Sequence, residues 1–425
     1  MGSVADLNQS YYAATAQAWE TQRSLGSALN CDVAVIGGGF TGLSAALACA
    51  EKGLSVVLLE AQTIGFGASG RNGGQLIPGL RWSMQEIDAE FGRERAQAIF
   101  DLAWSAGERV HDRIEKHNIN CDLKSGHLEA AFKPAHFDDM KREAEFLSRE
   151  FGWESIKVVA PEDMGDHING GDYHGGVYDP KGGHFHPLNY ALGLAKAALQ
   201  AGVRIYENTA ALAPTDKGMH VEIRAGAGSV SAKHVVIAAD NWTGDIAPEL
   251  ESYTVPIMNY NIATAPLPNA DQLLPSDAAI ADSRFVLNYF RLSADKRLIF
   301  GGGEKYVQQP PSDIAAFVRK HMVQVFPSLA QTPIDYAWGG AVGVTMNRLP
   351  HVGRKGNIFY AHGFSGHGAL VTTLTGELMA EAVVGTMSRF DVFANLPHSR
   401  FPGGKLLARP LATLGLLYYA MRDRL

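Results

Sequence analysis

Three groups of glycines in the chain have the spacing that binding of a polyphosphate requires. In the first group, Gly37, Gly39 and Gly42 follow the β-branched run 32–36 and precede an alanine-rich helical segment, 43–52. The first glycine of such a pattern allows a tight turn, the second lets the backbone approach a pyrophosphate, and the third lets the helix pack closely on the strand. The pattern predicts a dinucleotide site at the helix N-terminus, where free N–H groups attract phosphate.

An acidic residue stands where such a site needs one. Glu60 ends the next apolar run, 54–59, and a carboxylate there accepts hydrogen bonds from ribose hydroxyls and repels a 2′-phosphate. Phe40, Thr41 and Ala61 adjoin these positions and belong to the predicted contact set. The alternative is a glycine-rich turn beside a surface glutamate.

The second glycine group follows the 54–59 run directly and favours a flavin over a nicotinamide. So many glycines, together with small polar side chains, suit a loop that lies against a polyphosphate and a planar ring. A nicotinamide dehydrogenase does not need this second glycine-rich loop. The alternative interpretation is that the segment is a flexible surface loop without a ligand. The candidate contacts in this loop are Gly67, Ala68, Ser69, Arg71, Asn72, Gly73, Gly74 and Gln75.

The third group lies near the other end of the chain, between a predicted strand, 357–361, and a helix that starts near residue 370. The N-terminus of the helix that starts near residue 370 is therefore expected to point at the ligand, as the N-terminus of the first helix does. The dipole of this helix can stabilise negative charge on a reduced flavin ring. The candidate contacts are Gly363, Phe364, Ser365, Gly366, His367 and Gly368. Three such turns converging on one extended ligand predict FAD.

The elements that position these turns predict an α/β fold (α+β overall), in which a Rossmann-like FAD-binding domain is interleaved with a mixed-sheet substrate domain. A chain of 425 residues is long for one hydrophobic core, which also favours two domains. Strand and helix patterns alternate in 1–87, 176–250 and 338–425, which we assign to the FAD-binding domain. The remaining segments, 88–175 and 251–337, are assigned to the substrate-binding domain.

Composition excludes several classes of function. The chain has 37 Lys and Arg against 44 Asp and Glu, and a net charge of −7 argues against a nucleic-acid partner. Cys31, Cys49 and Cys121 are odd in number and form no C-x-x-C pair, so a disulfide framework is not expected. The histidines lack metal-ligand spacing, so no metal is expected.

The sequence predicts neither a signal peptide nor an integral membrane segment. The most apolar stretch, 406–421, contains Arg409, and we expect it to form a helix docked on the body, with peripheral membrane contact as the alternative. A cytoplasmic location is therefore expected.

These motifs resemble the D-amino-acid oxidase and sarcosine oxidase type of FAD-dependent amine oxidoreductase. Within it, the segments 10–12, 238–243 and 347–353, together with the third glycine group, resemble the bacterial γ-glutamylputrescine oxidases. The resemblance spans nearly the whole chain.

The resemblance implies positions for the rest of the cofactor. Ala211 corresponds to a small residue that packs on adenine, and Ala239 and Trp242 fall in the segment on the adenosine side. Relatives that attach flavin covalently use a cysteine late in the chain, which is absent here, so non-covalent FAD is expected. Amino-acid oxidases of this type carry an arginine for the substrate carboxylate where this chain has Val342, which makes a simple α-amino acid a poor substrate.

The implied activity is oxidation of a small-molecule amine, γ-glutamylputrescine or a related γ-glutamylated or polyamine substrate. A hydride equivalent leaves the carbon beside the amine nitrogen, the imine hydrolyses to an aldehyde and ammonia or an amine, and dioxygen is converted to peroxide. The tentative pocket residues are Gln75, Tyr289, Trp338 and His367. One alternative is a dehydrogenase that passes electrons to a quinone, and another is a nucleotide-binding module without redox turnover.

Overall fold

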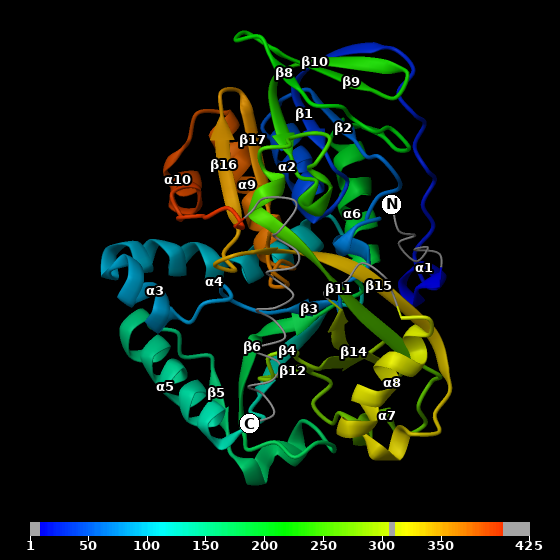
Figure 1. Ribbon diagram of the computed structural model, residues 1–425, viewed down its shortest axis with the longest axis vertical. Coiled ribbons are helices and arrows are strands. Elements are labelled where there is room, and N and C mark those ends of the chain that lie inside the picture. The colour runs from blue at the N-terminus through cyan, green and yellow to red at the C-terminus, as the bar shows by residue number, and fades with distance from the viewer. Residues whose placement is uncertain (1–8, 306–310, 403–425) are drawn as a thin grey trace.

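The computed structural model describes residues 9–305 and 311–402. Its two large β-sheets occupy the upper and lower halves of the molecule in Figure 1. The helix predicted over 406–421 lies outside the described residues. Within these residues no helix is both long and apolar enough to cross a membrane.

The first sheet has eight strands and carries the predicted βαβ unit. Its order is β16-β17-β10-β1-β2-β7, the hairpin strand β9 pairs with β10, and β8 pairs with β9. The strands from β17 to β7 are parallel, and β16 is antiparallel to β17. The bounds are β1 (Ala28–Ile36), β2 (Val56–Leu59), β7 (Arg204–Tyr206), β8 (Thr215–Asp216), β9 (Val221–Ala225), β10 (Gly228–Ile237), β16 (His351–Lys355) and β17 (Ile358–His362).

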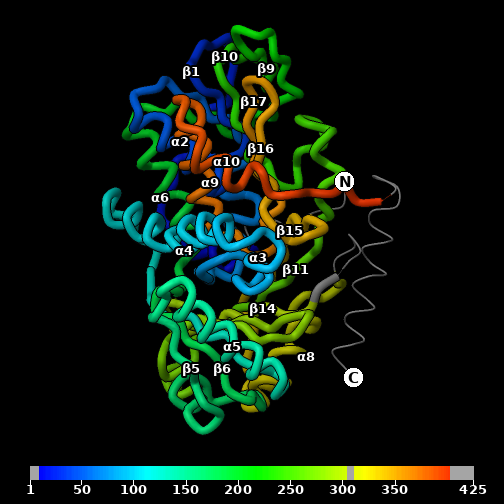
Figure 2. Tube along the Cα trace, turned by 90° about the vertical axis from the view of Figure 1, so that its left-hand side faces the viewer, coloured from blue at the N-terminus to red at the C-terminus, as the bar shows by residue number. Residues whose placement is uncertain are grey.

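Helices cover one face of this sheet. Val33 and Val35 of β1 share a core with the buried faces of these helices, whereas Ala34 and Ile36 face the opposite side, as the two-residue period of a strand requires. The helices are α2 (Phe40–Glu51), α4 (Arg93–Lys116), α6 (Pro187–Gln200), α9 (Val371–Val383) and α10 (Ser388–Ala394). Figure 2 shows α3 (Met84–Phe91) and α4 between the two halves, with α5 (Pro134–Phe151) on the lower one.

The second sheet has nine strands in the order β15-β11-β14-β13-β12-β4-β6-β3, with β5 paired to β6. One face packs on α7 (Ala270–Leu273) and α8 (Ile314–Val325) around Phe290 and Phe300. The bounds are β3 (Gln75–Leu76), β4 (Lys124–Ala130), β5 (Lys157–Val159), β6 (Gly176–His184), β11 (Thr254–Thr264), β12 (Ala279–Asp282), β13 (Tyr289–Leu292), β14 (Leu298–Lys305) and β15 (Ile334–Thr345).

Three strands of the second sheet come from segments that we assigned to the FAD-binding domain. They are β3, β6 and most of β15, each of which is hydrogen-bonded to a neighbouring strand of this sheet. The second sheet is therefore built from segments on both sides of the expected boundaries.

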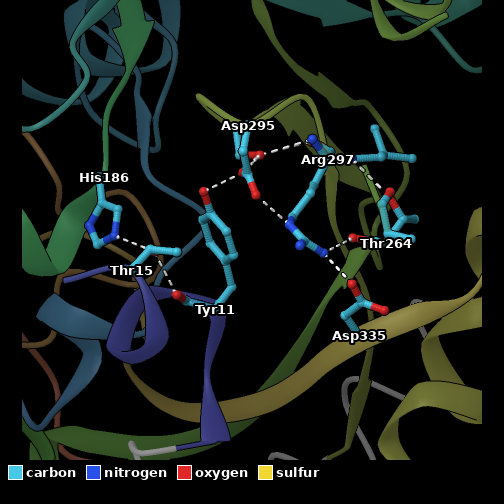
Figure 3. Close-up of polar contacts among 10 residues, drawn as sticks. Tyr11, Thr15, His186, Thr264, Asp295, Arg297 and Asp335 are labelled. Atoms are coloured by element: carbon cyan, nitrogen blue, oxygen red, sulfur yellow. Dashed lines mark hydrogen bonds and ion pairs between the residues drawn. The ribbon is translucent and has the colours of Figure 1, made fainter. Parts of the chain in front are cut away.

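The N-terminal helix α1 (Tyr11–Ala14) links the two halves (Figure 3). The Tyr11 hydroxyl donates to Asp295 Oδ1 at 2.7 Å in the turn between β13 and β14. Thr15 Oγ1 lies 3.1 Å from Nε2 of His186, the residue before α6. Arg297 pairs with Asp295 and donates to the carbonyl of Thr264 at 2.8 Å, so the whole group is fixed to the second sheet.

Candidate functional site

A cavity of about 1250 Å³ lies between the two sheets. The carboxyl ends of β1 and β2 line it on one side, and strands β4, β11, β13 and β15 line it on the other. Ligands of open α/β sheets bind at the carboxyl ends of the strands. The volume exceeds the roughly 300–1000 Å³ of an ordinary small-molecule pocket, so the cavity has room for a long cofactor and a substrate.

The first glycine turn has no space for side chains. A Cβ on Gly37, which has φ +113°, would lie 2.4 Å from the carbonyl oxygen of Ala238 in the turn after β10. A Cβ on Gly42 would lie only 1.9 Å from the Gly37 oxygen. Gly42 does not line the cavity, because its place is in the contact between α2 and β1. Gly39 is the N-cap residue of α2, and because it has no side chain, no side-chain oxygen caps the helix. The backbone of the turn therefore lines this end of the cavity.

Glu60 lies at the end of β2 and faces the same turn. Its carboxylate accepts hydrogen bonds from the backbone N–H of Gly38 at 2.6 Å and of Gln62 at 2.8 Å. Burial raises the pKa of this carboxyl, and the nearby Glu207 carboxylate raises it further. Ser69 of the second loop accepts a hydrogen bond from the Phe40 N–H at 2.9 Å, which fixes the second glycine loop to the start of α2.

The second loop is held closely against the second sheet. A Cβ on Gly73 would lie 2.5 Å from the ring of Tyr289, and a Cβ on Gly74, which has φ +74°, would lie 2.3 Å from the carbonyl oxygen of Phe185. Arg291, which is fully buried, donates from Nε to the Gly73 oxygen at 2.8 Å. Only glycines let the loop pass this close to β13.

Trp338 lies behind this loop and not in the cavity, where we expected it. Its side chain is 0% exposed, and its indole N–H donates to the Arg71 carbonyl at 3.0 Å. Tyr12 of α1 packs edge-on against the Trp338 ring, with ring centroids 5.1 Å apart, and its hydroxyl accepts from Arg291 at 3.2 Å. Trp338 and Tyr12 therefore support the backbone of the second loop.

The third glycine turn connects β17 to α9. Gly363, with φ +70°, donates from its N–H to Asp240 Oδ1 at 2.9 Å, and Ser365 N–H donates to the Gly343 oxygen at 2.9 Å. Burial lowers the pKa of His367 to about 4, and Arg81 contributes to the lowering, so this imidazole is neutral near pH 7.

The structure brings most of the predicted contact residues into one cavity. Gly42, Gly74 and Gly363 shape the backbone without lining it, and Trp338 lies behind the second loop. The predicted residues that do line it are Gly37, Gly39, Phe40, Thr41, Glu60, Ala61, Gly67, Ala68, Ser69, Arg71, Asn72, Gly73, Gln75, Ala211, Ala239, Trp242, Tyr289, Phe364, Ser365, Gly366, His367 and Gly368.

The wall formed by the second sheet contains polar residues that sequence reasoning missed. His127 and Glu129 line the cavity from β4, two residues apart and therefore on one face of the strand. Asn259 lines it from β11 and accepts a hydrogen bond from the Tyr289 hydroxyl. The signal in the sequence is a pair of polar residues at alternate positions in a short strand, but it does not show which ligand they face.

These features fit FAD. The glycine turns leave space only for backbone, α2 offers free backbone groups, and Trp242, at 52% exposure, is available beside Ala211 and Ala239 for the adenosine end. None of the three cysteines lines the cavity, which supports a non-covalent cofactor.

Comparison with known proteins agrees with this geometry. Residues 32–382 match the family described as FAD dependent oxidoreductase (DAO). The chain belongs to this family. It is 38% identical over 426 residues to the gamma-glutamylputrescine oxidoreductase of Escherichia coli (strain K12), which covers 99% of this chain and 100% of the relative. The predicted family, FAD cofactor and enzyme class are thereby confirmed.

Two solved structures share the fold of this chain. Glycine oxidase from Geobacillus kaustophilus superposes with a TM-score of 0.71 at 22% identity, covering 84% of this chain and 95% of that one. L-amino acid deaminase from Proteus vulgaris superposes with a TM-score of 0.72 at 19% identity, covering 87% and 94%. The predicted Rossmann-like α/β fold class is confirmed by these likenesses.

Proposed function

We propose that this FAD-dependent oxidoreductase oxidises γ-glutamylputrescine or a related γ-glutamylated or polyamine substrate. The products are an aldehyde, ammonia or an amine, and hydrogen peroxide, with dioxygen as the electron acceptor. The observation that carries the proposal is the full-length similarity to the Escherichia coli gamma-glutamylputrescine oxidoreductase.

The wall of the cavity supports an amine whose reacting carbon bears no carboxylate. Val342 lines the cavity from β15, where its partner across the ladder with β11 is Ile257, which also lines it. Two aliphatic side chains there offer no hydrogen bond to a carboxylate, which an arginine would bind in bidentate fashion.

The bound FAD supplies an acceptor for the hydride equivalent from the carbon beside the amine nitrogen. The residues of the chain orient the amine and exclude water. Gln75 donates from Nε2 to the Ile280 carbonyl at 2.9 Å, and Tyr289 donates to Asn259, so both side chains have fixed orientations. The neutral imidazole of His367 adds no positive charge that would repel the amine.

The test is an anaerobic titration of the purified flavoprotein with γ-glutamylputrescine, putrescine, spermidine and several amino acids, followed at the flavin absorbance. We expect γ-glutamylputrescine to bleach the flavin at the lowest concentration and to form peroxide when air is admitted. Rapid bleaching by α-amino acids alone would contradict the proposed substrate class.

The electron acceptor is tested in the same preparation. If the amine bleaches the flavin but no peroxide forms in air, and if the enzyme turns over with a quinone-like dye, the electron acceptor is a quinone and not dioxygen. No bleaching by any amine of the panel would favour the nucleotide-binding module.

A further inference from the structure

Two side chains of opposite charge face the cavity and are not paired. Glu129 lines it from β4, and Arg81 lines it from the segment just before α3. Within residues 9–305 and 311–402, neither side chain makes a hydrogen bond or an ion pair, and both are exposed to the cavity that they line. A guanidinium and a carboxylate that have no protein partner are both free to form charge-assisted hydrogen bonds to a ligand in the cavity, so this arrangement suits a ligand that carries both charges.

The two charges interact across a gap. Desolvation by the surrounding protein raises the pKa of the Glu129 carboxyl, Arg81 opposes this effect, and the carboxylate of Glu143 adds to it. Arg81 also acts electrostatically on His367 of the third glycine turn. The gap between Arg81 and Glu129 therefore lies toward the third-turn end of the cavity and not toward Trp242 at the predicted adenosine end.

A third polar group faces the same part of the cavity. His127 is 5% exposed, and its Nε2 has no hydrogen-bond partner in the described part of the chain. Burial lowers its pKa to about 3, so the ring is neutral near pH 7 and can form one further hydrogen bond without adding charge. A buried polar atom without a partner is rare in proteins and independently indicates a ligand here.

Other charged residues on the same wall already have partners. Arg142 of α5 pairs with Asp139 one helical turn before it. Glu143 accepts a hydrogen bond from the N–H of Met84 at 2.6 Å, at the start of α3. Arg81 and Glu129 differ from these residues because neither has a hydrogen-bond or ion-pair partner in the described part of the chain.

We propose that Arg81 and Glu129 form a subsite for an α-amino acid zwitterion at the distal end of the substrate. Arg81 binds the α-carboxylate, for which a planar guanidinium is suited, and Glu129 binds the α-ammonium group. The inference rests on the proposed function, because a γ-glutamyl amine carries such a zwitterion at the end opposite its reactive amine. In this arrangement the substrate carboxylate is bound at Arg81. The reacting carbon lies at the other end of the substrate, next to Val342.

The experiment measures binding without turnover. Isothermal titration calorimetry of the FAD-loaded protein uses γ-glutamyl-n-butylamide, which keeps the zwitterion and lacks the terminal amine. We expect Arg81→Gln and Glu129→Gln each to weaken its binding at least about tenfold, the loss typical of a charged hydrogen bond. Arg81→Lys keeps the positive charge but removes the planar guanidinium that binds a carboxylate through two hydrogen bonds, and we expect an intermediate loss of affinity. Arg142→Gln is the matched control, and we expect wild-type affinity from it.

The outcomes separate this inference from the proposed function. Wild-type affinity in Arg81→Gln or Glu129→Gln, at unchanged FAD content and melting temperature, would overturn the subsite even if γ-glutamylputrescine bleaches the flavin. Failure of the wild-type protein to bind γ-glutamyl-n-butylamide would also overturn it. Arginine-dependent binding of this ligand, without bleaching by γ-glutamylputrescine, would support the subsite and refute the proposed function.

Discussion

The substitution Gly42→Ala tests how the first glycine turn positions the cofactor. The added Cβ would lie 1.9 Å from the Gly37 carbonyl oxygen, whereas an ordinary contact needs more than about 3 Å. The start of α2 must therefore move away from β1 by roughly 1 Å, and overpacking of this kind destabilises proteins by about 1–3 kcal/mol. The N–H groups at the start of α2 move with the helix, so we expect FAD affinity to fall about tenfold to a hundredfold.

The assay is fluorescence titration of the apoprotein with FAD, together with denaturant unfolding. The matched control is Gly26→Ala, because a Cβ at Gly26 meets nothing within 4 Å. We expect this variant to keep both FAD affinity and unfolding midpoint. If Gly42→Ala retained wild-type affinity and stability while folding normally, the argument that α2 must approach β1 this closely would be refuted.

Three further predictions concern other parts of the molecule. Val342→Arg should raise kcat/KM for α-carboxylated amines relative to γ-glutamylputrescine, and an unaltered substrate ranking would remove Val342 from the substrate cavity. Tyr12→Phe deletes the hydroxyl that accepts from Arg291, which should lower stability by about 1 kcal/mol and weaken FAD binding measured by titration; equal FAD affinity would show that α1 does not support the second loop. Burial lowers the pKa of His351 to about 2 and of His362 to about 3, below the ordinary 6.5, so the unfolded chain takes up protons first as the pH falls. The resulting stability is complete above pH 6.5 and is lost below it by up to about 1.4 kcal/mol per pH unit for each histidine, and urea unfolding from pH 7 to 5 should show a smaller slope in His362→Gln.

The glycine turns could be predicted because their signal is local. Gly37 and Gly39 lie between β1 and α2, Gly42 lies in the first turn of α2, and Glu60 directly follows β2. Each turn needs only its neighbours in sequence to take its conformation. The cofactor could therefore be inferred before its surroundings were known.

The substrate wall could not be predicted in the same way, because it depends on pairing between distant segments. His127 and Glu129 reach the cavity only because β4 lies between β6 and β12. Trp338 and Val342 lie four residues apart on β15, yet Trp338 is buried under the second loop and Val342 lines the cavity. The two-residue period of a strand predicts which face of the sheet a side chain is on. It does not predict which other part of the protein covers that face at each position.

The contacts of helix α1 with the second sheet have a consequence for biosynthesis. Tyr11 and Tyr12 are synthesised well before their partners Asp295 and Arg291, which follow 284 and 279 positions later. Contacts so distant in sequence form slowly and only after both segments exist. The Gly73 carbonyl accepts a hydrogen bond from Arg291, so it cannot reach its final position until residue 291 has left the ribosome. Nascent chains arrested before residue 291 should therefore fail to retain FAD, which makes cofactor loading a late step in the maturation of the enzyme.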